Sequence, residues 1–184
     1  MDIDTEMRAT EATIEDLYCA PDDGTYELVN GKLHYMAPTN LEHGYVGSEI
    51  LFALKLYQRE RQNGFAVGDG PGFIVNLPHR RSFSPDVAWT LQDPRGFKRF
   101  VDGAPVFAVE VRSPSNSEDE RTRKRADYFA AGTYVVWDVD LDSYHITAYR
   151  HDMPDTPRVF RRGDIADAEP ALPGWRVAVN ALFS

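Results

Sequence analysis

The sequence predicts an α/β fold of the α+β kind, in which a mixed β-sheet is flanked by helices. Short β-prone runs are interspersed with two long helical patterns, as in domains that pack helices against a sheet. The run from Val106 to Val111 is almost wholly apolar, which is typical of a central strand covered on both faces. The 184 residues match the length of one domain. We therefore expect one domain over residues 13–184, preceded by a flexible acidic tail at residues 1–12.

The first strands are expected as a β-hairpin. Asn30-Gly31 joins two short β-prone runs within residues 26–35, and this dipeptide favours a type I′ turn. Later β-prone runs, bounded by Gly and Pro, predict six further strands and two edge strands. The six are expected at residues 65–67, 73–77, 86–91, 106–111, 134–140 and 144–150, and the edge strands at residues 158–161 and 175–179.

Two main helices are expected to cover the sheet, over residues 39–62 and 117–131. Each begins with the spacing of a capping box, Thr39 with Glu42 and Ser117 with Glu120. Asn63-Gly64 should stop the first helix, and Gly132 should be the C′ residue of the second. The apolar face of the first helix is predicted from its spacing: Leu41, Tyr45, Ile50, Leu54 and Tyr57.

Composition narrows the class of protein. The chain is 42% hydrophobic with a net charge of −9, and its bases are clustered at residues 80–81, 95–99, 121–125 and 158–162. These clusters are either solvated faces or local patches for a phosphate backbone. We expect no signal peptide and no membrane span, because no long apolar run exists. The single cysteine, Cys19, excludes an internal disulfide and a cysteine-based zinc site, and it favours a cytoplasmic location.

Two carboxylates stand where apolar residues are expected. Glu110 lies near the end of the apolar run and Asp86 begins a strand after Pro85. A buried carboxylate has to be protonated, paired or bound to a metal. Glu110 could form a structural ion pair with Arg112, which shares its strand face, and Asp86 could be an ordinary turn aspartate. Alternatively, both converge on one Mg²⁺, which accepts one or two carboxylates and keeps several waters.

Lys124 is a third candidate, because it lies on the helix that follows the Glu110 strand. Arg121, Lys124 and Tyr128 share one helix face by their i+3 and i+4 spacing. If this face turns inward, the Lys124 ammonium could reach a metal-bound water. Lysines at such positions are otherwise solvated surface charges.

The ordered set of motifs resembles the Uma-two family, bacterial proteins often labelled "putative restriction endonucleases" within the PD-(D/E)XK nuclease superfamily. The resemblance covers roughly Asp16 to Arg150. It rests on residues 26–31 (Tyr-Glu-Leu-Val-Asn-Gly), His43, residues 84–88 (Ser-Pro-Asp-Val-Ala), residues 109–115 (Val-Glu-Val-Arg-Ser-Pro-Ser), residues 124–128 (Lys-Arg-Ala-Asp-Tyr) and residues 131–140.

The resemblance implies a restriction endonuclease-like core and a division of roles. Asp86 would be the aspartate of the Pro-Asp pair, Glu110 the strand acid, and Lys124 the lysine moved from strand to helix. Glu27 matches an early acid close to the metal, and His43 matches a family histidine that could also be an ordinary helix-start residue. One departure is Arg112, which stands where the parent pattern has its lysine and cannot act as a general base.

The leading hypothesis is therefore metal-dependent hydrolysis of a phosphodiester, with DNA as substrate. Asp86, Glu110 and the backbone carbonyl of Val111 would hold Mg²⁺ or Mn²⁺, and Glu27 would bind the metal through water or help with a second ion. Lys124 would position the attacking water or accept its proton, and Arg112 would stabilise phosphate charge. The alternatives are a catalytically silent module that binds nucleic acid or protein, and a dimeric structural domain with an interface near Trp137, Tyr144 and Trp175.

Overall fold

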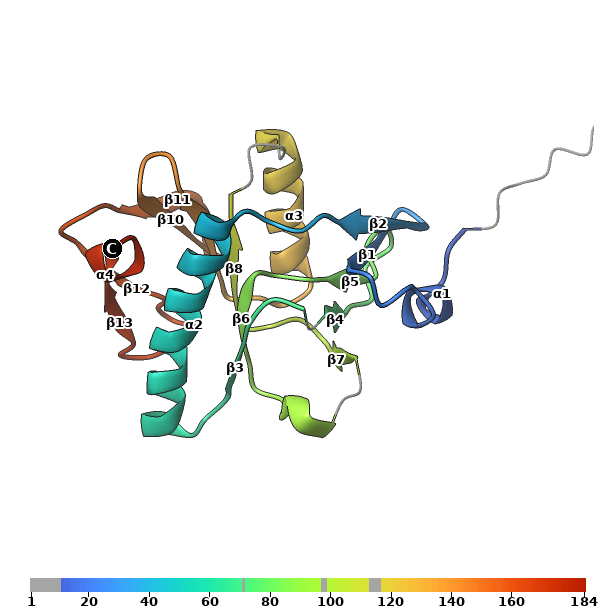
Figure 1. Cartoon of the computed structure of the whole chain (residues 1–184), viewed down its shortest axis with the longest axis horizontal. Helices are drawn as coiled ribbons and strands as arrows, with labels where there is room; N and C mark the ends of the chain where they lie inside the picture. The colour runs from blue at the N-terminus through green and yellow to red at the C-terminus, as the bar shows by residue number, and fades with distance from the viewer. Residues whose placement is uncertain (1–10, 71, 97–98, 113–116) are drawn as a thin grey trace, which may run out of the picture.

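A six-stranded mixed sheet forms the centre of the molecule, with helix α2 on one face and helix α3 on the other (Figure 1). The computed structural model describes residues 11–70, 72–96, 99–112 and 117–184. Strands β8 and β9 are parallel and every other neighbouring pair is antiparallel, so the predicted mixed sheet is confirmed. In spatial order the strands are β11 (Met153–Phe160), β10 (His145–Arg150), β9 (Val135–Asp140), β8 (Phe107–Val111), β6 (Val87–Thr90) and β3 (Phe65–Val67).

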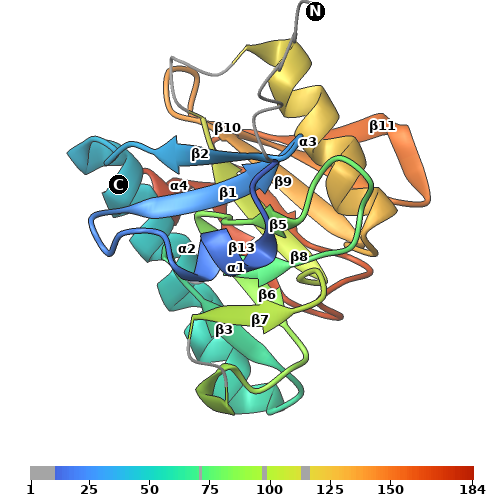
Figure 2. The same cartoon turned by 90° about the vertical axis from the view of Figure 1, so that its right-hand side faces the viewer.

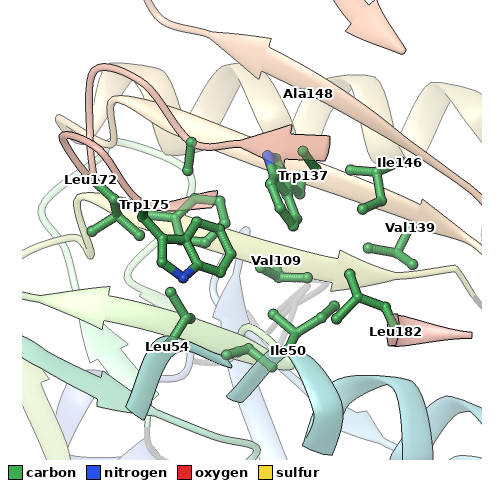
Figure 3. Packing of buried hydrophobic residues seen from close by; sticks show 14 of the residues in the cluster. Ile50, Leu54, Val109, Trp137, Val139, Ile146, Ala148, Leu172, Trp175 and Leu182 are labelled. Atoms are coloured by element: carbon green, nitrogen blue, oxygen red, sulfur yellow. The ribbon is translucent and has the colours of Figure 1, made fainter. Parts of the chain in front are cut away.

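One face of the sheet packs against α2 (Leu41–Arg61) and the C-terminal segment. Ile50 and Leu54 of α2 meet Val109 in the middle of β8, and Trp175 closes the cluster from the C-terminal side (Figure 3). The C-terminal segment contributes a two-stranded sheet and a short helix: β12 (Ile165–Asp167), β13 (Arg176–Ala178) and α4 (Val179–Leu182). This segment is therefore part of the main core.

The opposite face carries α3 (Glu118–Ala130) and a smaller sheet. Side chains alternate along a strand, so Ala108 and Glu110 of β8 point to this face while Val109 points to the other. The smaller sheet has the order β5 (Ser82–Phe83), β4 (Gly72–Ile74) and β7 (Phe100–Asp102), with a short 3₁₀ turn, η1 (Pro94–Gly96), before β7. Polar groups on this face of β8 are thereby placed under α3.

The predicted hairpin is confirmed as β1 (Thr25–Val29) and β2 (Lys32–Met36). Asn30 and Gly31 have φ values of 50° and 64°, which a type I′ turn requires at both central positions. The hairpin lies beside β5 and α1 (Ile14–Tyr18), apart from the main sheet (Figure 2). Backbone hydrogen bonds from Arg81 to Leu28 and from Asn30 to His79 attach it to the segment before β5. Glu27 is carried into the protein on this hairpin.

The start of α2 differs from the prediction. Asn40 is the N-cap and its side chain accepts a hydrogen bond from the His43 amide at 2.9 Å, so the predicted Thr39–Glu42 capping box is wrong. Leu41 and Tyr45 are 90% and 44% exposed, so they do not belong to the buried face. His43 and Val46 are the buried residues of the first two turns, and Val46 belongs to the main apolar core.

This correction gives a stability prediction. Asn40→Ala removes the acceptor that satisfies a free amide of the first turn, and we expect it to lower the free energy of unfolding by about 1 kcal/mol. Thr39→Ala is the matched control and should change the stability by less than about 0.5 kcal/mol, as ordinary surface substitutions do. Urea unfolding of both variants measures the difference. A larger loss for Thr39→Ala would contradict the assignment of the cap.

The other sequence predictions have mixed outcomes. The capping box of α3 is confirmed, with Ser117 as N-cap and Glu120 at N3, and Gly132 has a φ of 104° after the helix. The strand predicted at residues 73–77 is shorter, and the edge strand predicted at 158–161 begins at Met153. The segment predicted at 175–179 pairs with β12 instead of joining the main sheet. The elements α1, β5, β7, β12 and α4 were not predicted, because runs of two to five residues show no periodicity.

Two further expectations concern surfaces. Trp137 and Trp175 are buried in the core, so they form no dimer interface in the folded chain, whereas Tyr144 is 38% exposed. Among the described residues, no helix is long and apolar enough to cross a membrane. Residues 1–10 of the predicted acidic tail and the Ser113-Pro114-Ser115 part of the motif lie outside the described residues.

Candidate active site

Asp86 and Glu110 are brought together where β6 and β8 pair. The antiparallel register places Val87 opposite Val109, and the Asp86 amide donates to the Val109 carbonyl at 3.1 Å. The Asp86 carboxylate in turn accepts a hydrogen bond from the Val111 amide at 2.7 Å. This side chain is thereby fixed against the backbone of the residue that follows Glu110.

His43 lies beside two oxygen atoms of the kinds that bind metal ions, one from the Asp86 carboxylate and one from the Val111 backbone. Its Nε2 lies 3.4 Å from Asp86 Oδ2 and 3.1 Å from the Val111 carbonyl oxygen. Burial alone would lower the pKa of His43, but the hydrogen bond and the charge of Asp86 outweigh it and raise this pKa above its usual value. Protonated His43 is thus favoured between the Asp86 carboxylate and the Val111 carbonyl, two of the metal ligands predicted from the sequence. His43 is buried here and is not an ordinary helix-start residue.

Glu110 faces α3 and is held there by two donors. Lys124 Nζ lies 2.9 Å from its Oε2, and the Tyr128 hydroxyl donates to its Oε1 at 2.6 Å. Desolvation raises the pKa of Glu110 to about 7, and the charges of Asp86 and Glu27 add to this effect, while Lys124 opposes it. The predicted inward face of α3 is thus found for Lys124 and Tyr128. The ion pair between Glu110 and Arg112, one of the alternatives predicted from the sequence, is not formed.

Lys124 bridges two carboxylates. Its Nζ lies 2.9 Å from Glu27 Oε1 as well as 2.9 Å from Glu110 Oε2, with only 16% of the side chain exposed. Burial would lower the pKa of the ammonium, but the charges of Glu110 and Glu27 raise this pKa well above its usual value. A group that holds its proton so strongly is a donor and a local positive charge, which makes it a poor proton acceptor.

Glu27 reaches this cluster from the hairpin and is almost fully buried. Its Oε1 accepts from the Ser84 amide at 3.0 Å, and its Oε2 from Arg80 at 2.6 Å. Desolvation would raise the pKa of Glu27, but Lys124 and Arg80 together keep this pKa below its usual value. Glu27 is therefore a stable anion that contacts the ammonium of Lys124.

Arg80 and Asp127 were not singled out from the sequence as site residues. Arg80 is 8% exposed and donates through Nε to Asp127 Oδ2 at 2.8 Å, while His79 Nε2 lies 2.6 Å from Asp127 Oδ1. In the sequence Arg80 belongs to a basic cluster of the kind found on surfaces. Asp127 lies within the Lys124–Tyr128 motif, one position before Tyr128, and this was the only available signal.

The two remaining arginines of the sequence analysis have partners outside this cluster. Arg112 forms an ion pair with Asp140 at 2.8 Å, so it neutralises a carboxylate of β9 and not Glu110. Arg121 forms an ion pair with Glu118, three residues earlier on α3.

The donor set fits a hard divalent cation with few protein ligands. No group of three or more His, Cys, Asp or Glu side chains in metal-binding geometry occurs in the described part of the chain. Mg²⁺, however, needs only one or two carboxylates, because waters complete its octahedral shell. Asp86 and the Val111 carbonyl already converge on one point, and the Glu110 carboxylate lies on the neighbouring residue. These residues are therefore suitable ligands for Mg²⁺ or Mn²⁺.

Comparison with models of protein families shows which family the chain belongs to. The model of the Uma2 family, described as "Putative restriction endonuclease", matches residues 12–180. The chain belongs to this family. The match includes the hairpin with Glu27, Asp86, Glu110, α3 and nearly all of the C-terminal segment, so the Uma2 region extends beyond the motifs between Asp16 and Arg150.

A solved structure supports the Uma2 fold. The chain is similar to the crystal structure of a putative nuclease belonging to DUF820 from Anabaena variabilis ATCC 29413, with a TM-score of 0.75 and 18% sequence identity. The similarity covers 93% of this chain and 97% of the other. At this identity the comparison establishes the fold. No protein with a curated description matches the chain.

Proposed function

We propose that this protein is a metal-dependent nuclease that hydrolyses phosphodiester bonds, with DNA as its substrate. The observations that carry the proposal are that Asp86 and the Val111 carbonyl both lie beside His43 Nε2, and that Glu110, whose pKa is raised by burial and by the charge of Asp86, is held by the buried ammonium of Lys124. Membership of a family described as "Putative restriction endonuclease" supports the reaction and the choice of DNA. The net charge of −9 does not oppose this choice, because binding then depends on the local field of the site.

Asp86, Glu110 and the carbonyl of Val111 would hold Mg²⁺ or Mn²⁺. A divalent ion bound by these groups supplies a Lewis acid and lowers the pKa of a bound water. His43, with Nε2 within 3.4 Å of two of these oxygens, would give up its contacts with them when the ion binds, or would offer its ring nitrogen as a further ligand. Either rearrangement involves a side chain that is already fixed at the site.

The other residues of the cluster would orient and stabilise. Lys124 keeps its proton, so we assign it the orienting role toward the attacking water and the phosphate, and not the role of general base. Tyr128 holds the second oxygen of Glu110 and so fixes the orientation of this carboxylate. Glu27 anchors Lys124 from the side opposite Glu110. Arg112 is paired with Asp140, and it would stabilise phosphate charge only by exchanging this contact for one with the substrate.

Incubation with nucleic acid tests the proposed function. Supercoiled plasmid DNA should be converted to nicked and linear forms by the wild type in Mg²⁺ or Mn²⁺, and not in EDTA. The Glu110→Ala variant should be inactive in all three conditions. A folded wild type that leaves double-stranded DNA, single-stranded DNA and RNA intact in both metals, while still binding DNA, would overturn the proposal in favour of a binding module.

The pKa of Glu110 gives a pH prediction for metal binding. Because this carboxyl group holds its proton up to about pH 7, Mg²⁺ has to displace the proton at lower pH. We expect the affinity to be constant above about pH 8 and to fall about tenfold per pH unit once the pH is below about 7. Calorimetric titrations between pH 5.5 and 8.5, at roughly half-unit spacing, measure the slope.

Control variants separate the contributions of neighbouring groups to this slope. Although burial lowers it, the pKa of His43 is raised overall by Asp86, and the protonated imidazole contacts this carboxylate. Glu27 and Lys124 keep their charges and Tyr128 keeps its proton throughout this range. The His43→Asn variant removes the contribution of the imidazole and should retain the tenfold slope that Glu110 causes. A flat profile in His43→Asn would show that Glu110 is ionised well below pH 7.

A further inference from the structure

Arg80 connects three parts of the protein that the proposed reaction does not otherwise link. Its guanidinium donates through one terminal nitrogen to Glu27 of the hairpin at 2.6 Å, and through Nε to Asp127 of α3 at 2.8 Å. The same terminal nitrogen also donates to the Ser82 carbonyl of β5 at 3.3 Å. Its Cζ lies 4.9 Å from the centre of the Phe83 ring. All polar contacts are made by a side chain that is 9% exposed.

The contacts with Glu27, Asp127 and Phe83 each lead to Lys124 or Glu110. Glu27 binds Lys124 at 2.9 Å. Asp127 precedes Tyr128, whose hydroxyl binds Glu110, and the Tyr128 ring stacks on Phe83 with centroids 4.0 Å apart. Arg80 therefore fixes α3 at Asp127 and the hairpin at Glu27, which are the two elements whose relative position decides where the ammonium of Lys124 lies.

Lysine could not reproduce these contacts. A guanidinium presents donors in a rigid planar fork and can satisfy two separate carboxylates at fixed angles, whereas an ammonium acts as a point charge on a flexible stem. The two carboxylates also lie on different elements, so one arginine sets their separation. We propose that Arg80 is a positioning residue that holds Glu27 and α3 so that Lys124 stays between Glu27 and Glu110; its consequence for catalysis rests on the proposed function.

Arg125 provides a matched control for the loss of a buried ion pair. Arg125 lies on α3, next to Lys124 in the chain, and like Arg80 it is almost fully buried. It donates to Asp138 on β9 at 2.8 Å. Its guanidinium covers the Tyr149 ring with Cζ 3.7 Å from the ring centre. Its partners in the described part of the chain are Asp138, Thr122, Glu118 and Tyr149, and not Glu27, Lys124 or Glu110. Arg125→Met therefore removes a comparable ion pair without a change in the polar contacts of the Lys124 ammonium.

The first experiment uses the full-length protein without metal or substrate. A buried ammonium held by two carboxylates exchanges its protons slowly, so the Lys124 Nζ resonance should be visible in a ¹H–¹⁵N NMR spectrum, with Lys124→Met used for its assignment. We expect the resonance to disappear or shift in Arg80→Met and Arg80→Lys, and to remain in Arg125→Met. An unchanged resonance in both Arg80 variants would overturn the proposal.

The second experiment measures cleavage by the folded fraction of each variant. We expect Arg80→Met to lower kcat by about 10- to 100-fold, the usual effect of removing a group that orients a reacting residue. Because Arg80 acts in part through Glu27, the same substitution in a Glu27→Gln background should lower kcat by a clearly smaller factor than in the wild type. An equal loss in both backgrounds, or an equal loss in Arg125→Met, would show a merely structural role.

The variant that combines Glu27→Gln with Arg80→Met keeps the proposal testable even if Arg80→Met alone does not fold. Arg80→Met alone leaves Glu27 and Asp127 with one donor fewer, whereas Glu27→Gln with Arg80→Met removes one buried charge of each sign. If Arg80→Met does not fold, Arg80→Lys and the combined variant supply the spectra and the rates. If the wild type cleaves nothing, the proposed function fails, and the Lys124 resonance still decides the role of Arg80.

Discussion

Replacement of Glu110 by alanine is expected to abolish Mg²⁺ binding while the protein stays folded. Glu110 is a carboxylate ligand of the proposed site, and the remaining groups, Asp86 and one carbonyl, provide a single negative charge. We expect the Kd for Mg²⁺ to rise by about 100-fold or more, beyond the usual effect of an outer-shell residue. The fold should survive because Lys124 keeps Glu27 as a partner. We expect the unfolding free energy to fall by no more than about 3 kcal/mol from the unpaired donors.

The matched control for this prediction is Asp138→Asn. Asp138 stands opposite Glu110 in the parallel register of β8 and β9 and is more deeply buried, but its partner is Arg125. Its loss should change the stability and leave the affinity for Mg²⁺ within about twofold, because its ion-pair partner is Arg125 and not Lys124, Asp86 or Glu110. Calorimetry and urea unfolding of both variants test the pair. Unchanged metal affinity in Glu110→Ala would remove Glu110 from the site.

Replacement of Lys124 by methionine should have the opposite profile, with metal binding retained and cleavage lost. Lys124 is the positive charge closest to Glu110, and we expect kcat to fall by about 100- to 1000-fold, as when one preorganised donor to a transition state is removed. Metal affinity should not weaken, because an ammonium that competes with the ion for the Glu110 carboxylate is removed. Single-turnover cleavage and calorimetry separate the two quantities.

Two substitutions on the same helix control for this result. Arg123→Met removes an exposed charge one residue earlier and should leave kcat within about threefold of the wild type. Lys124→Arg keeps the charge but changes its geometry, so a rate between those of the wild type and Lys124→Met is expected. A Lys124→Met variant that cleaves at the wild-type rate would show that Lys124 serves only to balance the charges of Glu27 and Glu110.

The strands and helices that position the acids could be read from the sequence because their signals are local. The apolar run before Glu110, the Asn30-Gly31 turn and the capping box at Ser117 each depend on a few neighbouring residues, and all three are confirmed. The start of α2 was misjudged because Asn40 and Thr39 are both good N-caps. The hydrogen bond from the His43 amide to the Asn40 side chain distinguishes between them, and it is seen only in the structure.

The partners of the acids could not be read in the same way, because they come from distant segments. Glu27 meets Arg80 across 53 residues, and Arg112 binds Asp140 of β9 in place of Glu110 on its own strand. Charge clusters were also poor guides to exposure. Arg80 and Arg125 belong to two of the four basic clusters, yet both are buried in ion pairs and are not available to a phosphate backbone.

The most direct test of the central claim is a crystal structure of the wild type grown with Mn²⁺, with the ion located by its anomalous scattering. The account predicts a manganese ion bound by the carboxylates of Asp86 and Glu110 and by the Val111 carbonyl, at distances of about 2.0–2.2 Å, a range close to that of Mg²⁺. Crystals soaked in Mn²⁺ that show no ion between these residues, with Lys124 still bound to both Glu27 and Glu110, would contradict it.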